Sequence, residues 1–177
     1  MTTVTLALIM SLAIPAASGA KSGDDHHRAA QKQCKEERGK SSATREAFKA
    51  KYHSMSRCVR RTEADEEREA KEARKNAAQE CKDERKALGP DEFAEQYGTN
   101  NNKNNAFGKC VSAKAKEKKA EMDEEDAEKI AKRKHAARGC AAERKEIGDE
   151  EFAEKYGTNE NKKNAFGKCV SGTARGQ

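Results

Sequence analysis

The sequence has few of the residues that build an ordinary hydrophobic core. It contains no Trp, two Pro and only 5% aromatic residues. After residue 20, eleven of the 157 residues are Leu, Ile, Val or Phe, a share at which disorder becomes the usual expectation. A single conventional core is therefore excluded. These few apolar residues nevertheless recur at fixed offsets, which indicates small units that other bonds must hold together.

The first twenty residues have no charged side chain, unlike the rest of the chain. An apolar run, Val4 to Ala17, is followed by the small residues Ser18-Gly19-Ala20. This pattern predicts a secretory signal peptide at 1–20 that is cleaved after Ala20, although its start lacks Lys and Arg. The alternative is an uncleaved anchor, but the run is short for a bilayer span. We therefore expect a secreted or extracytoplasmic protein.

One pattern occurs three times: Cys-x-x-Glu-Arg, then Phe-x-x-x-Tyr, then Cys-Val. The copies begin at Cys34, Cys81 and Cys140, and the last two are identical at 25 of 37 aligned positions. The first copy is degenerate and lacks the Asn-rich loop of the others. The predicted organisation is a signal peptide at 1–20, a flexible N-terminal tail at 21–28, a degenerate repeat 1 at 29–60, a helical spacer at 61–75, repeat 2 at 76–112, a helical spacer at 113–134, repeat 3 at 135–171 and a C-terminal tail at 172–177.

The six cysteines indicate disulfides, because an even number in an exported chain is typical of them. Six cysteines allow fifteen pairings. The repeat favours the pairing that stays within each copy: Cys34–Cys58, Cys81–Cys110 and Cys140–Cys169.

The composition between these cysteines is that of helices. Ala, Glu, Lys and Arg dominate, and the breaks coincide with Gly89-Pro90 and Gly148. We predict an all-α fold: an elongated array of three disulfide-stapled helical hairpins joined by charged helical spacers. The expected module cores are Phe48, Tyr52, Leu88, Phe93, Tyr97, Phe107, Val111, Ile147, Phe152, Tyr156, Phe166 and Val170.

The two spacers are almost entirely charged residues and Ala. Only Met122 and Ile130 stand out at positions where a coiled coil would place its seam, so a coiled-coil core has weak support. Pairs such as Glu67/Lys71 stand four apart in the favourable order for an isolated helix. We therefore expect solvated single helices.

No residue pattern indicates an active or metal site. Structural zinc requires four ligands, whereas each repeat has two cysteines, and His26 and His27 near Cys34 fit a mobile tail equally well. The loop that starts at Gly98 lacks the carboxylates of a calcium loop. A catalytic cysteine would need an unpaired thiol and a base. We predict no metal, no cofactor and no enzymatic activity.

The Arg of Cys-x-x-Glu-Arg is the one recurring residue that could bind a ligand. These residues are Arg38, Arg85 and Arg144. The alternative is structural, with each stem packed over Phe or Tyr and the guanidinium bound to a carboxylate or helix end. Nucleic acid is an unlikely partner class, because acidic residues interleave with the basic ones.

The motifs CxxER, FxxxYGTN and NAFGKCVS resemble a repeat of uncharacterised exported bacterial proteins, chiefly of the actinobacterial type. The resemblance covers repeats 2 and 3 closely and repeat 1 loosely. It implies export and no activity.

The function we expect is that of a secreted, non-catalytic structural or multivalent binding protein of the cell envelope or exterior. The net charge of +6 permits weak attraction to anionic surfaces without specifying one, and the two partners considered are an anionic cell-wall polymer and another envelope protein. The alternative is a cationic protein that acts on membrane surfaces, but this would require an apolar face that the spacers lack.

Overall fold

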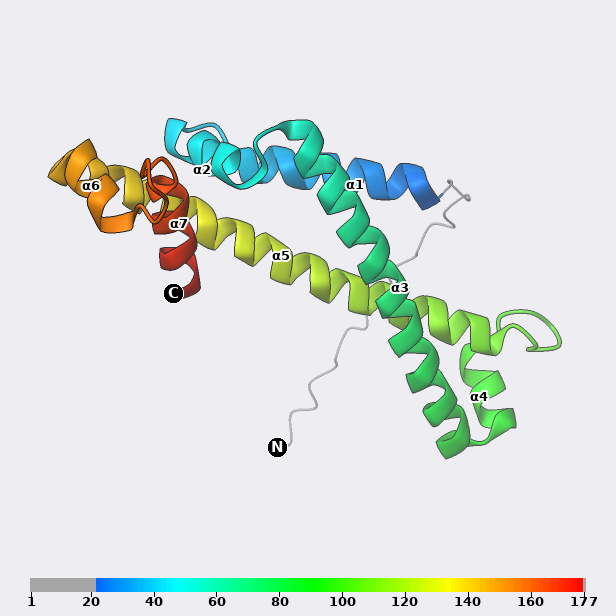
Figure 1. Cartoon of the computed structure of the whole chain (residues 1–177). Coiled ribbons are helices and arrows are strands. Elements are labelled where there is room, and N and C mark those ends of the chain that lie inside the picture. The colour runs from blue at the N-terminus through cyan, green and yellow to red at the C-terminus, as the bar shows by residue number, and fades with distance from the viewer. Residues whose placement is uncertain (1–21, 177) are drawn as a thin grey trace, which may run out of the picture.

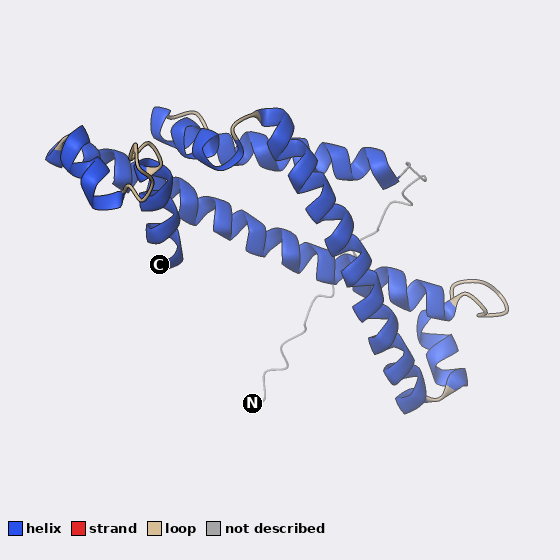
Figure 2. Cartoon of the chain, in the orientation of Figure 1, coloured by secondary structure: helices blue, strands red, loops and turns tan. Residues whose placement is uncertain are grey.

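The structure, a computed structural model, describes residues 22–176 and is almost entirely helical in that part (Figures 1 and 2). The predicted signal peptide at 1–20 lies outside the described residues. The helices are α1 (Ser22–Arg38), α2 (Ser42–Tyr52), α3 (Met55–Leu88), α4 (Pro90–Tyr97), α5 (Ala106–Ile147), α6 (Asp149–Tyr156) and α7 (Ala165–Gly176). No strand is present between residues 22 and 176, so the all-α prediction is confirmed.

The helix boundaries follow from local residue chemistry. Ser41 and Ser54 cap α2 and α3, since each side-chain oxygen accepts a hydrogen bond from a first-turn backbone N–H at 3.2 Å. Gly89 and Gly148 end α3 and α5 at φ of 86° and 89°, a conformation that disfavours any side chain. Pro90 then opens α4, where its missing N–H has no consequence.

Three disulfides close three helical hairpins, with the pairing predicted from the repeat. Cys34–Cys58 joins α1 to α3, Cys81–Cys110 joins α3 to α5, and Cys140–Cys169 joins α5 to α7. Each of the two long helices therefore belongs to two hairpins. Continuous helix, rather than a flexible linker, connects one repeat to the next (Figure 1).

A small apolar cluster surrounds each disulfide and contains the predicted core residues. Repeat 1 buries Phe48 and Tyr52, while repeat 2 buries Phe93 and only half-buries its other predicted core residues. The half-buried members of repeat 2 are Leu88, Tyr97, Phe107 and Val111. Repeat 3 buries Phe152, Phe166 and Val170 and half-buries Ile147 and Tyr156.

The spacers are charged helices, but the prediction that they are solvated single helices is wrong. They cross one another, with α3 packed on α5 and α1 packed on α3 (Figure 1). Ala73 is 1% exposed and Ile130 is 7% exposed at these contacts. Small Ala side chains let the helix backbones approach, so an Ala-rich sequence that lacks a coiled-coil seam still forms a helix–helix interface.

A lysine provides the polar part of this crossing. The Lys119 Nζ lies 2.8 Å from a carboxylate oxygen of Glu66 and 3.3 Å from one of Glu69, and it also contacts Asp123. Glu66 is buried, so the ammonium group compensates for the cost of removing its charge from water.

Both predicted tails are helical where the structure describes them, which corrects the prediction that the N-terminal tail is flexible. Residues 22–28 form the start of α1, and residues 172–176 form the end of α7. Asp24 and Asp25 occupy the first turn of α1, where negative charge interacts favourably with the helix dipole. None of the helices in residues 22–176 is both long enough and apolar enough to span a bilayer.

Candidate functional site

A tyrosine–glutamate hydrogen bond recurs in every repeat. The Glu of Cys-x-x-Glu-Arg accepts a bond from the Tyr of Phe-x-x-x-Tyr. The three bonds are Tyr52 to Glu37 at 2.8 Å, Tyr97 to Glu84 at 2.6 Å and Tyr156 to Glu143 at 2.9 Å. The bond ties the intermediate helix of each repeat to the helix that carries the first cysteine. The Glu was not among the predicted site residues, although its recurrence in all three copies was a usable signal.

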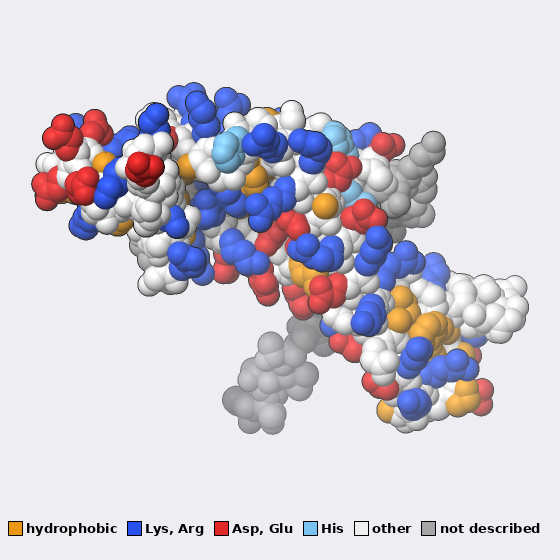
Figure 3. Space-filling model, viewed as in Figure 1, with side chains coloured by type: hydrophobic (Ala, Val, Ile, Leu, Met, Phe, Trp, Pro, Cys, Tyr) orange, Lys and Arg blue, Asp and Glu red, His pale blue; other side chains and the backbone are white. Residues whose placement is uncertain are grey.

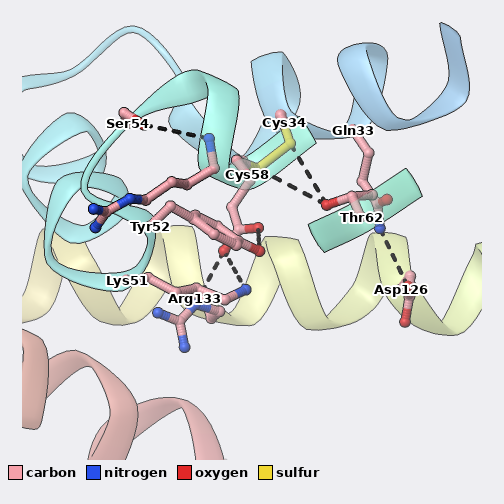
Figure 4. The surroundings of a disulfide bond; sticks show 11 residues. Gln33, Cys34, Lys51, Tyr52, Ser54, Cys58, Thr62, Asp126 and Arg133 are labelled. Atoms are coloured by element: carbon pink, nitrogen blue, oxygen red, sulfur yellow. Dashed lines mark hydrogen bonds and ion pairs between the residues drawn. A yellow bond between two sulfur atoms is a disulfide. The ribbon is translucent and has the colours of Figure 1, made fainter. Parts of the chain in front are cut away.

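In repeat 1 this glutamate is buried and binds three side chains, Lys51, Tyr52 and Arg133, which are labelled in Figure 4. Glu37 is 7% exposed and also binds the Lys51 Nζ at 2.8 Å and the Arg133 Nε at 3.2 Å. Burial, reinforced by the Glu37 charge, raises the pKa of Tyr52 well above its usual range. Burial lowers the pKa of Lys51, and the bond to Glu37 opposes that shift. Because Arg133 belongs to α5, the cluster fixes repeat 1 against the helix that leads into repeat 3.

A second contact joins repeat 1 to repeat 3 directly. Ala43 and Ala47 of α2 pack in one cluster with Phe166 and Val170 of α7. A Cβ added at Gly167 would lie 3.2 Å from the Ala50 Cβ, so the glycine lets the two helices approach closely. The α2 helix thus covers the outer face of the third hairpin.

An arginine clamps the edge of this contact. The two Nη atoms of Arg144 donate to the two carboxylate oxygens of Glu46 at 2.7 and 2.8 Å. The guanidinium carbon also lies 4.8 Å from the centre of the Phe166 ring. The bond to Glu46 raises the pKa of Arg144, so the guanidinium keeps its positive charge at alkaline pH.

The three candidate binding arginines therefore differ in their surroundings. Arg144 shows the structural arrangement considered from the sequence, with its guanidinium over Phe and bound to a carboxylate. Arg85 is exposed, so the structural alternative, with its stem packed over Phe or Tyr, does not hold for it. Arg38 is exposed at the end of α1. The structure does not bring the three together.

The junction of α2, α5 and α7 leaves a cleft of about 600 Å³ that is lined with basic side chains. Its basic lining residues are Lys51, His53, Arg133, Lys163, Lys168 and Arg175. Asn159, Asn164 and Ser171 supply neutral polar groups, and none of the carboxylates in the described part of the chain lines this cleft. The sequence reasoning missed it because its residues come from both ends of the chain.

Only part of this positive charge is balanced by the protein itself. Glu37 pairs with Lys51 and Arg133, as described above. Among the described residues, Lys163, Lys168 and Arg175 form no ion pair, and neither does His53. His53 holds its backbone at φ of 67°, which is uncommon for a residue with a side chain. The cleft can therefore receive an anionic group without first breaking a salt bridge at these four positions.

Other polar clusters already have internal partners. Glu66, Glu69 and Asp123 are close enough to hold a cation, but Lys119 supplies the positive charge. Cys34 forms a disulfide and cannot join His26 or His27 in a zinc site.

The Asn-rich loops are likewise held by their own side chains. Asn105 accepts from the Thr99 N–H at 3.0 Å and donates to the Thr99 hydroxyl at 2.8 Å, and Asn164 repeats both bonds with Thr158. Hydrogen bonds within the loops therefore account for these Asn residues, and no ligand is needed to explain them.

The three disulfides indicate the kind of compartment in which the protein functions. Comparisons with known proteins identify no relative. Three buried disulfides are typical of an oxidising, extracytoplasmic compartment. No protein-family model, no curated protein and no solved structure matches the chain.

Proposed function

We propose that this is a secreted, non-catalytic binding protein of the cell envelope or exterior that holds a linear anionic polymer in the cleft between repeats 1 and 3. The observation that carries the proposal is the lining of that cleft, where residues 22–176 contribute six basic side chains and no carboxylate. Lys and Arg side chains bind phosphate and carboxylate groups through charge-assisted hydrogen bonds.

The shape and surroundings of the cleft favour a polymer over a small molecule. It is open, and no aromatic or large aliphatic side chain of the described residues lines it, whereas sites for small organic ligands are mostly apolar. Acidic side chains gather instead at the α6 tip, where Asp149, Glu150 and Glu151 occupy the first turn (Figure 3). Like-charge repulsion there would direct an anionic chain toward the basic cleft.

In this proposal the three repeats do not act as three separate binding modules. The cleft forms where α2 meets α7, and within residues 22–176 repeat 2 has no corresponding helix across it. The many identical groups of a polymer, rather than three identical modules, would then supply the multivalency. The predicted signal peptide and the disulfides support an extracytoplasmic location for such a partner.

Titration of the oxidised, full-length protein with linear polyphosphate tests the proposal. The cleft variant carries Lys163→Gln, Lys168→Gln and Arg175→Gln. The control variant carries Arg74→Gln, Lys75→Gln and Lys116→Gln, which are exposed residues outside the cleft. Both variants lower the formal net charge from +6 to +3. We expect the cleft variant to bind at least about tenfold more weakly, equal to about 1.4 kcal/mol, and the control to change little. If binding weakened equally in the two variants, net charge alone would explain the effect and the proposal would be wrong.

A further inference from the structure

Repeats 2 and 3 are nearly identical in sequence but differ in what covers them. In repeat 3, Phe166 is 6% exposed and Val170 is fully buried, because α2 lies over them. Their counterparts in repeat 2, Phe107 and Val111, remain half-buried. No helix of the described chain takes the position of α2 on repeat 2, whose cluster draws its members from α3, α4 and α5 alone.

The remaining contacts of α2 also have unused counterparts on repeat 2. Arg85 corresponds to Arg144, but it is exposed and forms no ion pair within residues 22–176. Gly108 corresponds to Gly167, but a Cβ added there would meet nothing within 4 Å. Figure 3 shows hydrophobic side chains exposed at the end of the molecule that contains α4, with basic side chains around them. We call Arg85, Leu88, Phe107, Gly108 and Val111 the open face of repeat 2.

The chemistry of the missing helix can be inferred from α2. That helix presents Ala43, Ala47 and Ala50 at positions i, i+4 and i+7, with Glu46 at i+3. Small residues let it lie close to the glycine of α7, and its carboxylate neutralises the arginine. A partner helix for the open face would need the same row of small residues, here called the small stripe, and the same carboxylate.

We propose that the open face of repeat 2 binds an amphipathic helix of another protein that carries Ala or Gly at i, i+4 and i+7 and Glu at i+3. This site is separate from the cationic cleft. Its evidence is the occupied copy of the same surface within this chain and the unpaired positive charge of Arg85.

A second copy of this chain is a poorer occupant. Two open faces that met across a two-fold axis would place Arg85 against its own counterpart, and like charges repel. The α2 helix of a second copy is already committed to its own repeat 3 through Arg144. Between residues 22 and 176, no other segment has the Ala-x-x-Glu-Ala-x-x-Ala pattern.

The probe is a synthetic peptide of residues 41–53 that retains the small stripe and Glu46. Phe48→Gln and Tyr52→Gln remove the face that packs in repeat 1, and a covalent brace between positions 45 and 49 stabilises the short helix. Binding to the oxidised, full-length protein is measured by fluorescence anisotropy, and backbone NMR shifts locate the site. We expect shifts at Phe107 and Val111.

Two variants test the surface without disturbing the core. Gly108→Gln places a side chain where the helix must approach, and we expect binding to weaken at least about tenfold. Arg85→Glu should weaken binding by about the same factor, and a peptide with Glu46→Arg should recover it on the Arg85→Glu protein. Thermal melting checks that both variants fold as the parent does.

Three results would overturn the proposal. One is absence of saturable binding. Another is a set of shifts confined to Phe166 and Val170, which would show that the peptide merely displaces α2 from repeat 3. The third is a concentration-dependent dimer that Gly108→Gln abolishes, which would assign the open face to a second copy of this chain.

Discussion

Loss of a disulfide should have unequal effects in repeats 2 and 3, although their loops are the same length. The variants are Cys81→Ala/Cys110→Ala and Cys140→Ala/Cys169→Ala. Each disulfide joins residues that are 29 apart in sequence. In the chain-entropy model, each loop closure contributes about 3.5 kcal/mol. The two losses would therefore be equal if the disulfide were the only difference.

Because α2 covers repeat 3, that repeat should tolerate the loss of its disulfide better than repeat 2. The fuller burial of Phe166 and Val170 over Phe107 and Val111 contributes roughly 1–2 kcal/mol, a fraction of the value for burying whole side chains. The half-exposed Arg144–Glu46 pair adds about 0.2–1 kcal/mol. We expect repeat 3 to remain about 2 kcal/mol more resistant to opening, which is roughly a thirtyfold lower open population.

Hydrogen exchange measured repeat by repeat can detect this difference where a global melting curve cannot. After loss of Cys81–Cys110, amides around Phe93 should exchange at rates close to those of unstructured peptide. After loss of Cys140–Cys169, amides around Phe152 should keep measurable protection. Equal protection in the two variants, or less protection in repeat 3, would refute the reasoning that α2 stabilises that repeat.

The further predictions concern single residues and pH. Gly98→Ala should lower the melting temperature, because the added Cβ would lie 2.5 Å from the Ala94 carbonyl oxygen, whereas Gly139→Ala within α5 should stabilise by about 0.5–1 kcal/mol. Tyr156→Phe should cost about 0.5–1 kcal/mol in chemical denaturation, because it removes the half-buried bond to Glu143, and an unchanged midpoint would contradict that role. Lys155 and Tyr156 hold the pKa of Glu143 below its usual value, so this stabilisation is present above about pH 5 and is lost as the pH falls through the lowered pKa. Burial and Glu143 raise the pKa of Tyr156, so the contribution of Tyr156 to stability is lost only as the pH rises through a value above about 10. A melting temperature that decreases as the pH is raised from about 5 to about 10 would contradict both assignments.

The secondary structure and the disulfides could be predicted because their signals are local or repeated. Good helix formers fill the segments that precede Gly89 and Gly148, and these two glycines mark the ends of α3 and α5. The repeat reduced the possible cysteine pairings to the one that the structure contains.

The packing of repeat 1 on repeat 3 could not be predicted in the same way. It depends on small residues of α2, such as Ala43 and Ala47, which differ little from the Ala of a solvated helix when only sequence is known. The same difficulty hid the crossing of α3 and α5, where Ala73 is buried. The recurring Glu, by contrast, carried a signal in all three copies, and only its tyrosine partner was assigned to the core.

The cationic cleft was beyond sequence reasoning because its charges are dispersed along the chain. Lys51 and His53 precede Lys163 and Lys168 by more than 100 residues, with many acidic residues between them. Only the docking of α2 on α7 separates these basic residues from the acidic ones.

The central claim is that α2 docks on repeat 3 and thereby forms the cleft, and a charge exchange between Glu46 and Arg144 tests it most directly. Amide exchange in α2 and α7 would be compared in Glu46→Arg, Arg144→Glu and the double variant. We predict that each single variant accelerates exchange in both helices and that the double variant restores protection, since the opposite charges meet again in reversed order. Additive acceleration in the double variant, or no change in either single variant, would contradict the claim.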